Sequence, residues 1–177
     1  MKKIMMMAAV ICAAVASQAA VVNWGGSAKI TLDGVAQAGA VVNLYLVNYD
    51  GLGNDLLIDT RTTVATGAAA NKGKLNAGAG ESQTVKYGEN TVGEVTFDIT
   101  AASQVYAVIT SLDGEYKQTT AAQALTGLTD TQKASLQFAF TDVKGDAVGT
   151  WQAVPEPTSG LLLLLGVAGL ALRRKKA

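Results

Sequence analysis

The sequence predicts an all-β fold: a single antiparallel β-sandwich-like domain over residues 20–153. Short runs that alternate apolar and polar residues support it, because a half-buried strand presents successive side chains to opposite faces. Glycine-containing turns separate these runs, and short strands joined by such turns are typical of a sandwich. Apolar segments flank the domain and predict an N-terminal signal helix within residues 1–19 and a C-terminal transmembrane helix at about 159–172.

The strand signals differ in strength along the domain. Residues 94–99 alternate strictly, residues 105–110 are apolar on both faces, and apolar residues recur at every second position of 136–141. The other expected strands are 28–32 and 41–48, with weaker candidates at 21–24, 56–58, 62–66, 84–87, 115–119 and 150–153. The expected core is Ile30, Leu44, Leu46, Val95, Phe97, Ile99, Val105, Ala107, Ile109, Leu136, Phe138 and Phe140.

The segments between the strands carry turn and loop signals. Asp33-Gly34 and Asp113-Gly114 suit turns that need a positive φ. The stretch 67–80 is mostly glycine and alanine, and we expect a flexible surface loop there. A short helix is expected over 121–125, with Thr120 as its N-cap.

Residues 1–19 have the form of a secretory signal peptide. Two lysines form its charged start, an apolar stretch follows, and small residues occupy the −3 and −1 positions of a cut after Ala19. A cut after Ala20 fits less well, because it places Gln18 at −3. We therefore expect signal peptidase to cleave here and the domain to be exported.

The C-terminal segment 154–177 has three parts. The Pro155-Glu156-Pro157 elbow cannot continue a fold, because each proline fixes φ, lacks an N–H and holds the preceding residue extended. The thirteen apolar residues 160–172 reach about 20 Å, short of a hydrocarbon core of about 30 Å. Four cations follow, and their stems extend the effective span: Arg173, Arg174, Lys175 and Lys176. A terminal, non-amphipathic run with this basic flank predicts a membrane segment whose basic end stays in the cytoplasm.

These three parts, in this order, resemble the PEP-CTERM sorting signal of Gram-negative bacteria, also known as an ice-binding-protein C-terminal domain. The resemblance covers residues 154–177 only. It implies that Pro155, Glu156 and Pro157 are recognised by exosortase, a membrane-embedded cysteine protease. It also implies an exported protein, anchored in the inner membrane with a periplasmic domain and then placed at the cell surface or outer envelope, in association with exopolysaccharide. It does not indicate what the domain does.

Composition excludes several classes of activity for the domain. Without the leader and the tail, eight cations and thirteen acids remain, a net charge of −5, whereas a nucleic-acid partner requires clustered cations. The chain has no histidine, which removes Ser-His-Asp and Cys-His catalysis and every imidazole metal site. Its one cysteine, Cys12, lies in the leader, so the domain has no thiol chemistry. We expect no enzyme and no cofactor.

Residues 48–59 are the best candidate for a metal site. On a calcium-loop template, Asn48 takes position 1, Asp50 position 3 and Asp59 position 12. Leu52 at position 5 offers no side-chain oxygen, so a polar loop between two strands is the favoured interpretation. The candidate side-chain ligands of this calcium loop are Asn48, Asp50, Asn54 and Asp59.

Two functions from different classes remain for the domain. The first is a structural or adhesive surface protein without catalysis, and the second is a small glycan-binding module. The second rests on Trp24, Trp151 and the tyrosines as a platform on which sugars stack. We favour the first, because aromatic residues of a sandwich more often belong to its core and edges.

Overall fold

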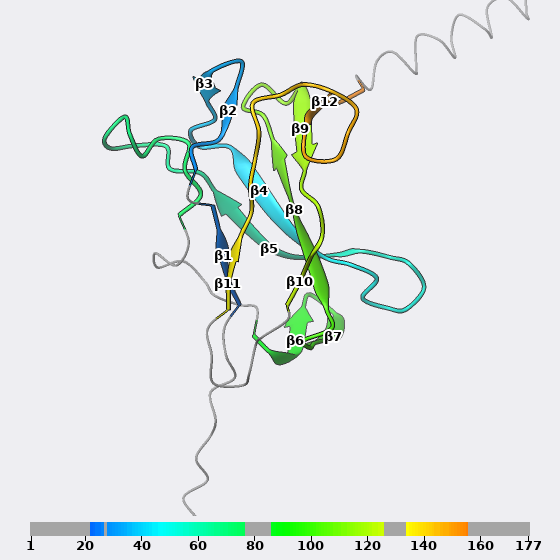
Figure 1. The fold of residues 1–177 in the computed structure, drawn as a ribbon. Coiled ribbons are helices and arrows are strands. Elements are labelled where there is room, and N and C mark those ends of the chain that lie inside the picture. Colours follow the sequence, from blue (N-terminus) through cyan, green and yellow to red (C-terminus); the bar gives the residue numbers. More distant parts are fainter. Residues whose placement is uncertain (1–21, 27, 77–85, 126–133, 156–177) are drawn as a thin grey trace, which may run out of the picture.

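The computed structural model describes residues 22–26, 28–76, 86–125 and 134–155, and every helix or strand element within them is a strand (Figure 1). The all-β prediction is therefore confirmed for this part of the chain. The expected signal helix and transmembrane helix lie outside the described residues. Among the described residues, no helix has the length and apolar character needed to span a bilayer.

A six-stranded antiparallel sheet forms the centre of the molecule (Figure 1). β8 pairs with β4 on one side and with β9 and β10 on the other, while β5 and β12 form the two edges. The strands of this sheet are β4 (Val41–Leu46), β5 (Leu56–Thr62), β8 (Gln104–Thr110), β9 (Tyr116–Thr119), β10 (Gln123–Ala124) and β12 (Trp151–Ala153).

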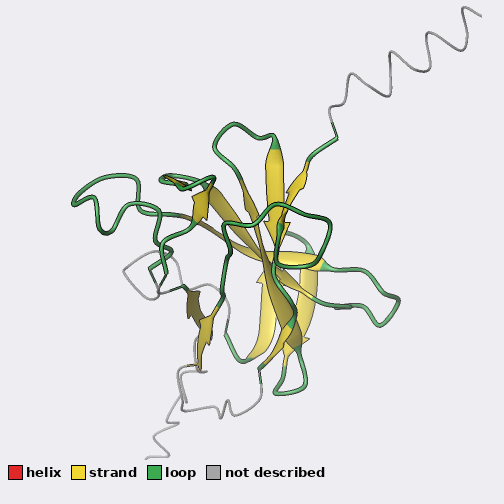
Figure 2. Cartoon of the chain, turned by 45° about the horizontal axis from the view of Figure 1, so that its top comes forward, coloured by secondary structure: helices red, strands yellow, loops and turns green. Residues whose placement is uncertain are grey.

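Three two-stranded units complete the fold, and the turned view shows them beside the large sheet, joined by loops (Figure 2). Two are antiparallel hairpins, β2–β3 and β6–β7, and the third is the parallel pair β1–β11. Their bounds are β1 (Val22–Gly25), β2 (Thr31–Leu32), β3 (Val35–Ala36), β6 (Gly88–Val92), β7 (Val95–Ile99) and β11 (Ala134–Gln137).

The parallel β1–β11 pair corrects the prediction of a purely antiparallel sandwich. Alternation along a sequence shows which side chains share a face, but it does not show the direction of the neighbouring strand. The layer over the core side of the large sheet is also not a second complete sheet. It includes the β1–β11 pair and the β2–β3 hairpin, since Trp24 of β1 and the Thr31 carbonyl of β2 are bonded to residues of the large sheet.

The core lies on one face of the large sheet. The strand register places Val42, Leu44 and Leu46 of β4 opposite alternate residues of β8, and all three are buried. Ten of the twelve expected core residues are buried, while Val95 and Phe140 are only half-buried. Val95 is the first residue of β7, in a hairpin that pairs with no other described strand, and the first buried residue of β7 is Phe97.

Two loop predictions need correction. The segment 121–125 forms no helix: β10 pairs with β8, and Leu125 is buried and donates its N–H to the Ser103 carbonyl. A free strand edge offered these amides partners that a one-turn helix cannot match. Within the expected surface loop, Leu75 is 1% exposed and its carbonyl accepts from Gly26 N at 2.7 Å. This loop is therefore anchored to the core at Leu75, and its residues 77–80 lie outside the described residues.

The Asp33-Gly34 turn is confirmed. Asp33 has φ 52° and Gly34 φ 74°, so both central residues of the β2–β3 hairpin are left-handed, as a type I′ turn requires. At the second predicted turn Gly114 has φ 77°.

Residues 56–62 form one continuous strand, so no separate strand begins at Thr62.

Candidate functional site

β12 carries the chain from the domain into the C-terminal segment. Trp151 is 1% exposed and donates its indole N–H to Thr31 O at 2.9 Å. Val154 N donates to Glu115 O at 2.7 Å, and Pro155, the first residue of the elbow, is exposed immediately beyond that bond. The sheet therefore ends where the elbow begins, with no linker between them.

The other predicted processing residues lie outside the described residues. They are Ala19 and Ala20 at the signal peptidase site, Glu156 and Pro157 of the elbow, and the basic cluster Arg173, Arg174, Lys175 and Lys176.

The structure does not gather the oxygens of the candidate calcium loop around one point. The Asn48 side-chain oxygen accepts from Gly53 N at 2.6 Å, and Asp50 accepts from the Asn54 side chain at 2.6 Å. Asp59 belongs to β5, where its carboxylate accepts from the Trp24 indole at 2.7 Å. Within the described ranges, no group of three or more acidic or other ligand-type side chains is arranged to hold a metal ion. The loop is thus closed by its own hydrogen bonds.

Both tryptophans are core residues, as the favoured interpretation of the aromatic residues predicts, so the alternative of a sugar platform on them is wrong in that part. Trp24 is 0% exposed; its ring packs edge-on against Phe138, and the Arg61 guanidinium lies 4.9 Å from its centre. Trp151 is equally enclosed. A sugar can stack only on an aromatic face that solvent reaches, and neither indole offers one.

Two tyrosines instead lie on the outer face of the large sheet. Tyr45 of β4 and Tyr106 of β8 are directly opposite each other, with ring centres 5.3 Å apart and planes 11° apart. Both are half-buried. The Tyr106 hydroxyl donates to Asp55 at 2.9 Å, and the other oxygen of that carboxylate accepts from Asn48 N at 3.0 Å.

A depression of about 650 Å³ opens on this face beside the tyrosine pair. Its lining comes from β4, the β4–β5 connection, β8, β9, the start of the β9–β10 connection and the 142–150 segment. The lining residues are Tyr45, Val47, Asp55, Tyr106, Val108, Lys117, Thr119, Thr120, Ala121, Ala122 and Val148. We call it the tyrosine depression.

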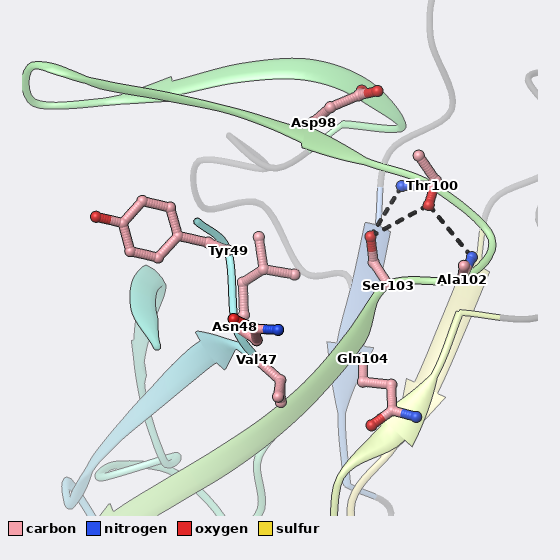
Figure 3. A pocket seen from close by; sticks show the side chains of 9 residues that line it. Val47, Asn48, Tyr49, Asp98, Thr100, Ala102, Ser103 and Gln104 are labelled. Carbon is pink, nitrogen blue, oxygen red and sulfur yellow. Dashed lines mark hydrogen bonds between the residues drawn. The ribbon is translucent and has the colours of Figure 1, made fainter. Parts of the chain in front are cut away.

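A second, more polar pocket of about 350 Å³ lies at the end of the sheet and shares Val47 with the tyrosine depression. Figure 3 shows Thr100 and Ser103 on one wall, joined by hydrogen bonds. Asp98 comes from β7, and Tyr49 comes from the segment after β4. Ser103 accepts from Thr100 N at 3.0 Å, so part of this wall is already hydrogen-bonded within itself.

Local contacts shift the pKa of a few groups near these surfaces. Burial, with the hydrogen bond to Asp55 next, raises the pKa of Tyr106 to about 12. Its hydroxyl therefore stays protonated and donates to the carboxylate. Hydrogen bonds from the Asn54 side chain and Leu52 N lower the pKa of Asp50. This loop carboxylate is therefore ionised at neutral pH.

Sequence reasoning did not single out Tyr45, Tyr106 and Asp55 as a group. The alternation of 41–48 does place Tyr45 on the face opposite Leu44 and Leu46. Its pairing with Tyr106 depends on the register between β4 and β8, which alternation alone leaves undetermined.

Comparison with known proteins identifies one segment. Residues 153–175 match the PEP-CTERM protein-sorting motif, so the resemblance of the C-terminal tail is confirmed. A motif of this kind implies an exported, membrane-anchored substrate of Gram-negative type that is processed by exosortase. No curated protein matches the chain. No solved structure matches it either.

Proposed function

We propose that the chain is a cell-surface protein whose C-terminal segment directs its sorting and whose β-rich domain has a structural or adhesive role without catalysis. In this proposal, signal peptidase removes the leader, the apolar tail holds the chain in the inner membrane, and exosortase cuts at the elbow. The released domain then associates with the exopolysaccharide matrix at the outer envelope.

The observation that carries the proposal is the sorting motif at 153–175, which begins at the last residue of the last strand. Two prolines hold the elbow extended, which is the conformation a protease requires of its substrate, and they prevent a membrane helix from continuing into it. A run of thirteen apolar residues is a marginal span, and mismatch costs a fraction of a kcal/mol per Å. A weak span suits a segment that is held briefly and then cut.

The composition supports a role without catalysis. The chain lacks histidine, and its single cysteine lies in the leader. The domain therefore has no imidazole to act as a general base and no thiol nucleophile.

Intact-mass measurement of the protein recovered from the surface of its own cells tests the sorting proposal. We expect a mature chain that begins at Ala20, ends within or next to 154–158 and lacks Arg173 to Lys176. A Pro155→Ala, Glu156→Ala, Pro157→Ala triple variant should keep its tail. A Lys72→Ala variant, changed at an exposed loop position of the domain, is the control and should be processed normally. A mature wild-type chain with an intact tail, or unchanged processing of the triple variant, would refute the proposal and leave a plain anchor.

The alternative function is glycan binding. Both tryptophans are buried and cannot stack on a sugar, but Tyr45 and Tyr106 are only half-buried. The tyrosine depression is the specific observation that favours it, and its geometry supports a defined ligand class.

A further inference from the structure

We propose that the tyrosine depression is a binding site for a neutral sugar, in which the pyranose ring stacks on Tyr106 and its hydroxyls bond to Asp55 and Lys117. This gives the adhesive role a ligand, and it rests on the proposed function only for its cellular setting. The class of ligand is a neutral hexopyranosyl oligosaccharide or polysaccharide.

The position of Tyr106 in the sheet leaves one side of its ring for a ligand. β8 lies between β4 and β9, so Tyr45 covers one side of the Tyr106 ring and the other side is turned toward residues 119–122. These residues line the same depression, and Ala121 and Ala122 are small and exposed. The space between them and the ring is therefore open to a flat group. The apolar C–H face of a pyranose is such a group, and it packs on the electron-rich face of an aromatic ring.

The ring is also held in place before any ligand arrives. It stacks on Tyr45, and its hydroxyl is fixed by the 2.9 Å bond to Asp55. A side chain whose position is already restrained loses little conformational entropy when a ligand binds to it.

The polar groups of the depression match sugar hydroxyls. Each Asp55 oxygen accepts one hydrogen bond, from Tyr106 and from Asn48 N, and each keeps a lone pair for a ligand hydroxyl. Such bonds from hydroxyl to carboxylate are short and strong. Lys117 is exposed and lines the same depression as a donor. Within the described part of the chain, no carboxylate forms a salt bridge with this lysine.

The charge of the lining favours a neutral sugar over a charged polymer. One carboxylate and one ammonium line the depression, so their charges balance. A polyanion would meet repulsion from Asp55, and it requires several clustered cations. The lining combines one free aromatic face with polar groups on different strands, as small-molecule sites do.

Calorimetric titration of the full-length chain, kept in solution with a zwitterionic detergent that contains no sugar, tests the proposal. The probes are cellohexaose, maltohexaose and β-1,4-mannohexaose, with hexamannuronate as the acidic comparison. We expect at least one neutral probe to bind, with a Kd between about 10 μM and 1 mM. Hydrogen exchange followed by mass spectrometry should show slower exchange in peptides that cover 104–108 and 117–122.

Two variants address the residues that carry the proposal. Tyr106→Leu keeps the apolar bulk but removes the ring face and the hydroxyl, and Asp55→Asn removes the charge that strengthens the hydroxyl bonds. Each should weaken the binding about tenfold or more. Tyr116→Leu is the matched control: Tyr116 is half-buried and lies outside the depression, so affinity should stay within about twofold. If Tyr106→Leu fails to fold, the proposal is tested by the Asp55→Asn variant, whose changed side chain is exposed, and by the hydrogen-exchange pattern of the wild type.

Several results would overturn the assignment. The proposal is wrong if no neutral probe binds, or if a folded Tyr106→Leu variant keeps full affinity. It is also wrong if the chain prefers hexamannuronate and that preference weakens with added salt. Self-association of the chain that Tyr106→Leu abolishes would assign this face to a second copy instead. The mass of the mature protein is measured independently, so a failure here leaves the sorting proposal intact.

Discussion

Replacing Asp59 with asparagine would leave the Arg61 guanidinium without its counter-charge in a nearly closed space. The Asp59 and Arg61 side chains are 11% and 12% exposed, and Arg61 Nε lies 3.4 Å from Asp59 Oδ2. Asp59 also accepts from the Trp24 indole at 2.7 Å, and Arg61 donates to Trp24 O at 2.9 Å. This group, the Trp24 cluster, joins the edge strand β5 to β1.

The expected loss in the free energy of unfolding depends on the contacts that Arg61 and residue 59 keep after the substitution. Removing one member of a buried ion pair costs about 3–5 kcal/mol in the free energy of unfolding. Here Arg61 retains its bond to the Trp24 carbonyl and its contact with the ring, and asparagine can still accept from the indole. We therefore expect about 2–3 kcal/mol, or roughly 5–10 °C in Tm for a chain of this size.

Urea unfolding of the full-length chain, followed by tryptophan fluorescence, measures this change because both indoles are buried. Asp98→Asn is the control: Asp98 is exposed on the β6–β7 hairpin, and its replacement should cost less than about 0.5 kcal/mol. In an Arg61→Met background, Asp59→Asn should cost at least about 1 kcal/mol less, since no buried cation remains to be neutralised. Equal losses for Asp59→Asn and Asp98→Asn would show that the pair is solvated and refute the reasoning.

Three further predictions concern other features of the fold. Tyr106 should be the last tyrosine to ionise, near pH 12, in absorbance titrations at high pH. Because the pKa of Tyr106 is raised in the folded state, its contribution to stability is present below about pH 10 and is lost as the pH rises through 12. Asp55→Asn should shift that ionisation to lower pH. Gly73→Ala should cost more than Gly34→Ala in thermal unfolding: both have positive φ, but a Cβ at Gly73 meets a carbonyl oxygen at 3.1 Å, whereas that at Gly34 meets nothing within 4 Å. Trp151→Ala should cost about 3–5 kcal/mol in urea without changing the affinity for any sugar that the chain binds.

The faces of the central strands could be predicted from the sequence. Alternation in 41–48 separates Leu44 and Leu46 from Tyr45, and the structure buries the first two and half-exposes the third. This works because a strand in a sheet with one buried face must place every second residue toward the core.

Partner choice could not be predicted in the same way. β1 pairs with β11, more than a hundred residues later, and it does so in parallel. Asp59 was a candidate ligand only in the less favoured calcium-loop interpretation, and the register with β4 turns it toward Trp24. The first outcome depends on pairing between strands far apart in the chain, and the second on the β4–β5 register and on where β1 places Trp24, and neither leaves a local pattern in the residues concerned. The C-terminal motif was identifiable because its parts are contiguous in the chain.

The exit of the chain through β12 determines how this domain responds to a pull. Force applied through the C-terminal segment meets Val154 first, and an antiparallel edge strand loaded from its end opens one hydrogen bond at a time. Trp151 is the last residue of β12 to detach, because its indole must leave the core and break its bond to Thr31 O. A single side chain thus acts as a mechanical clamp that passes tension from the tether to β2 in the opposite layer.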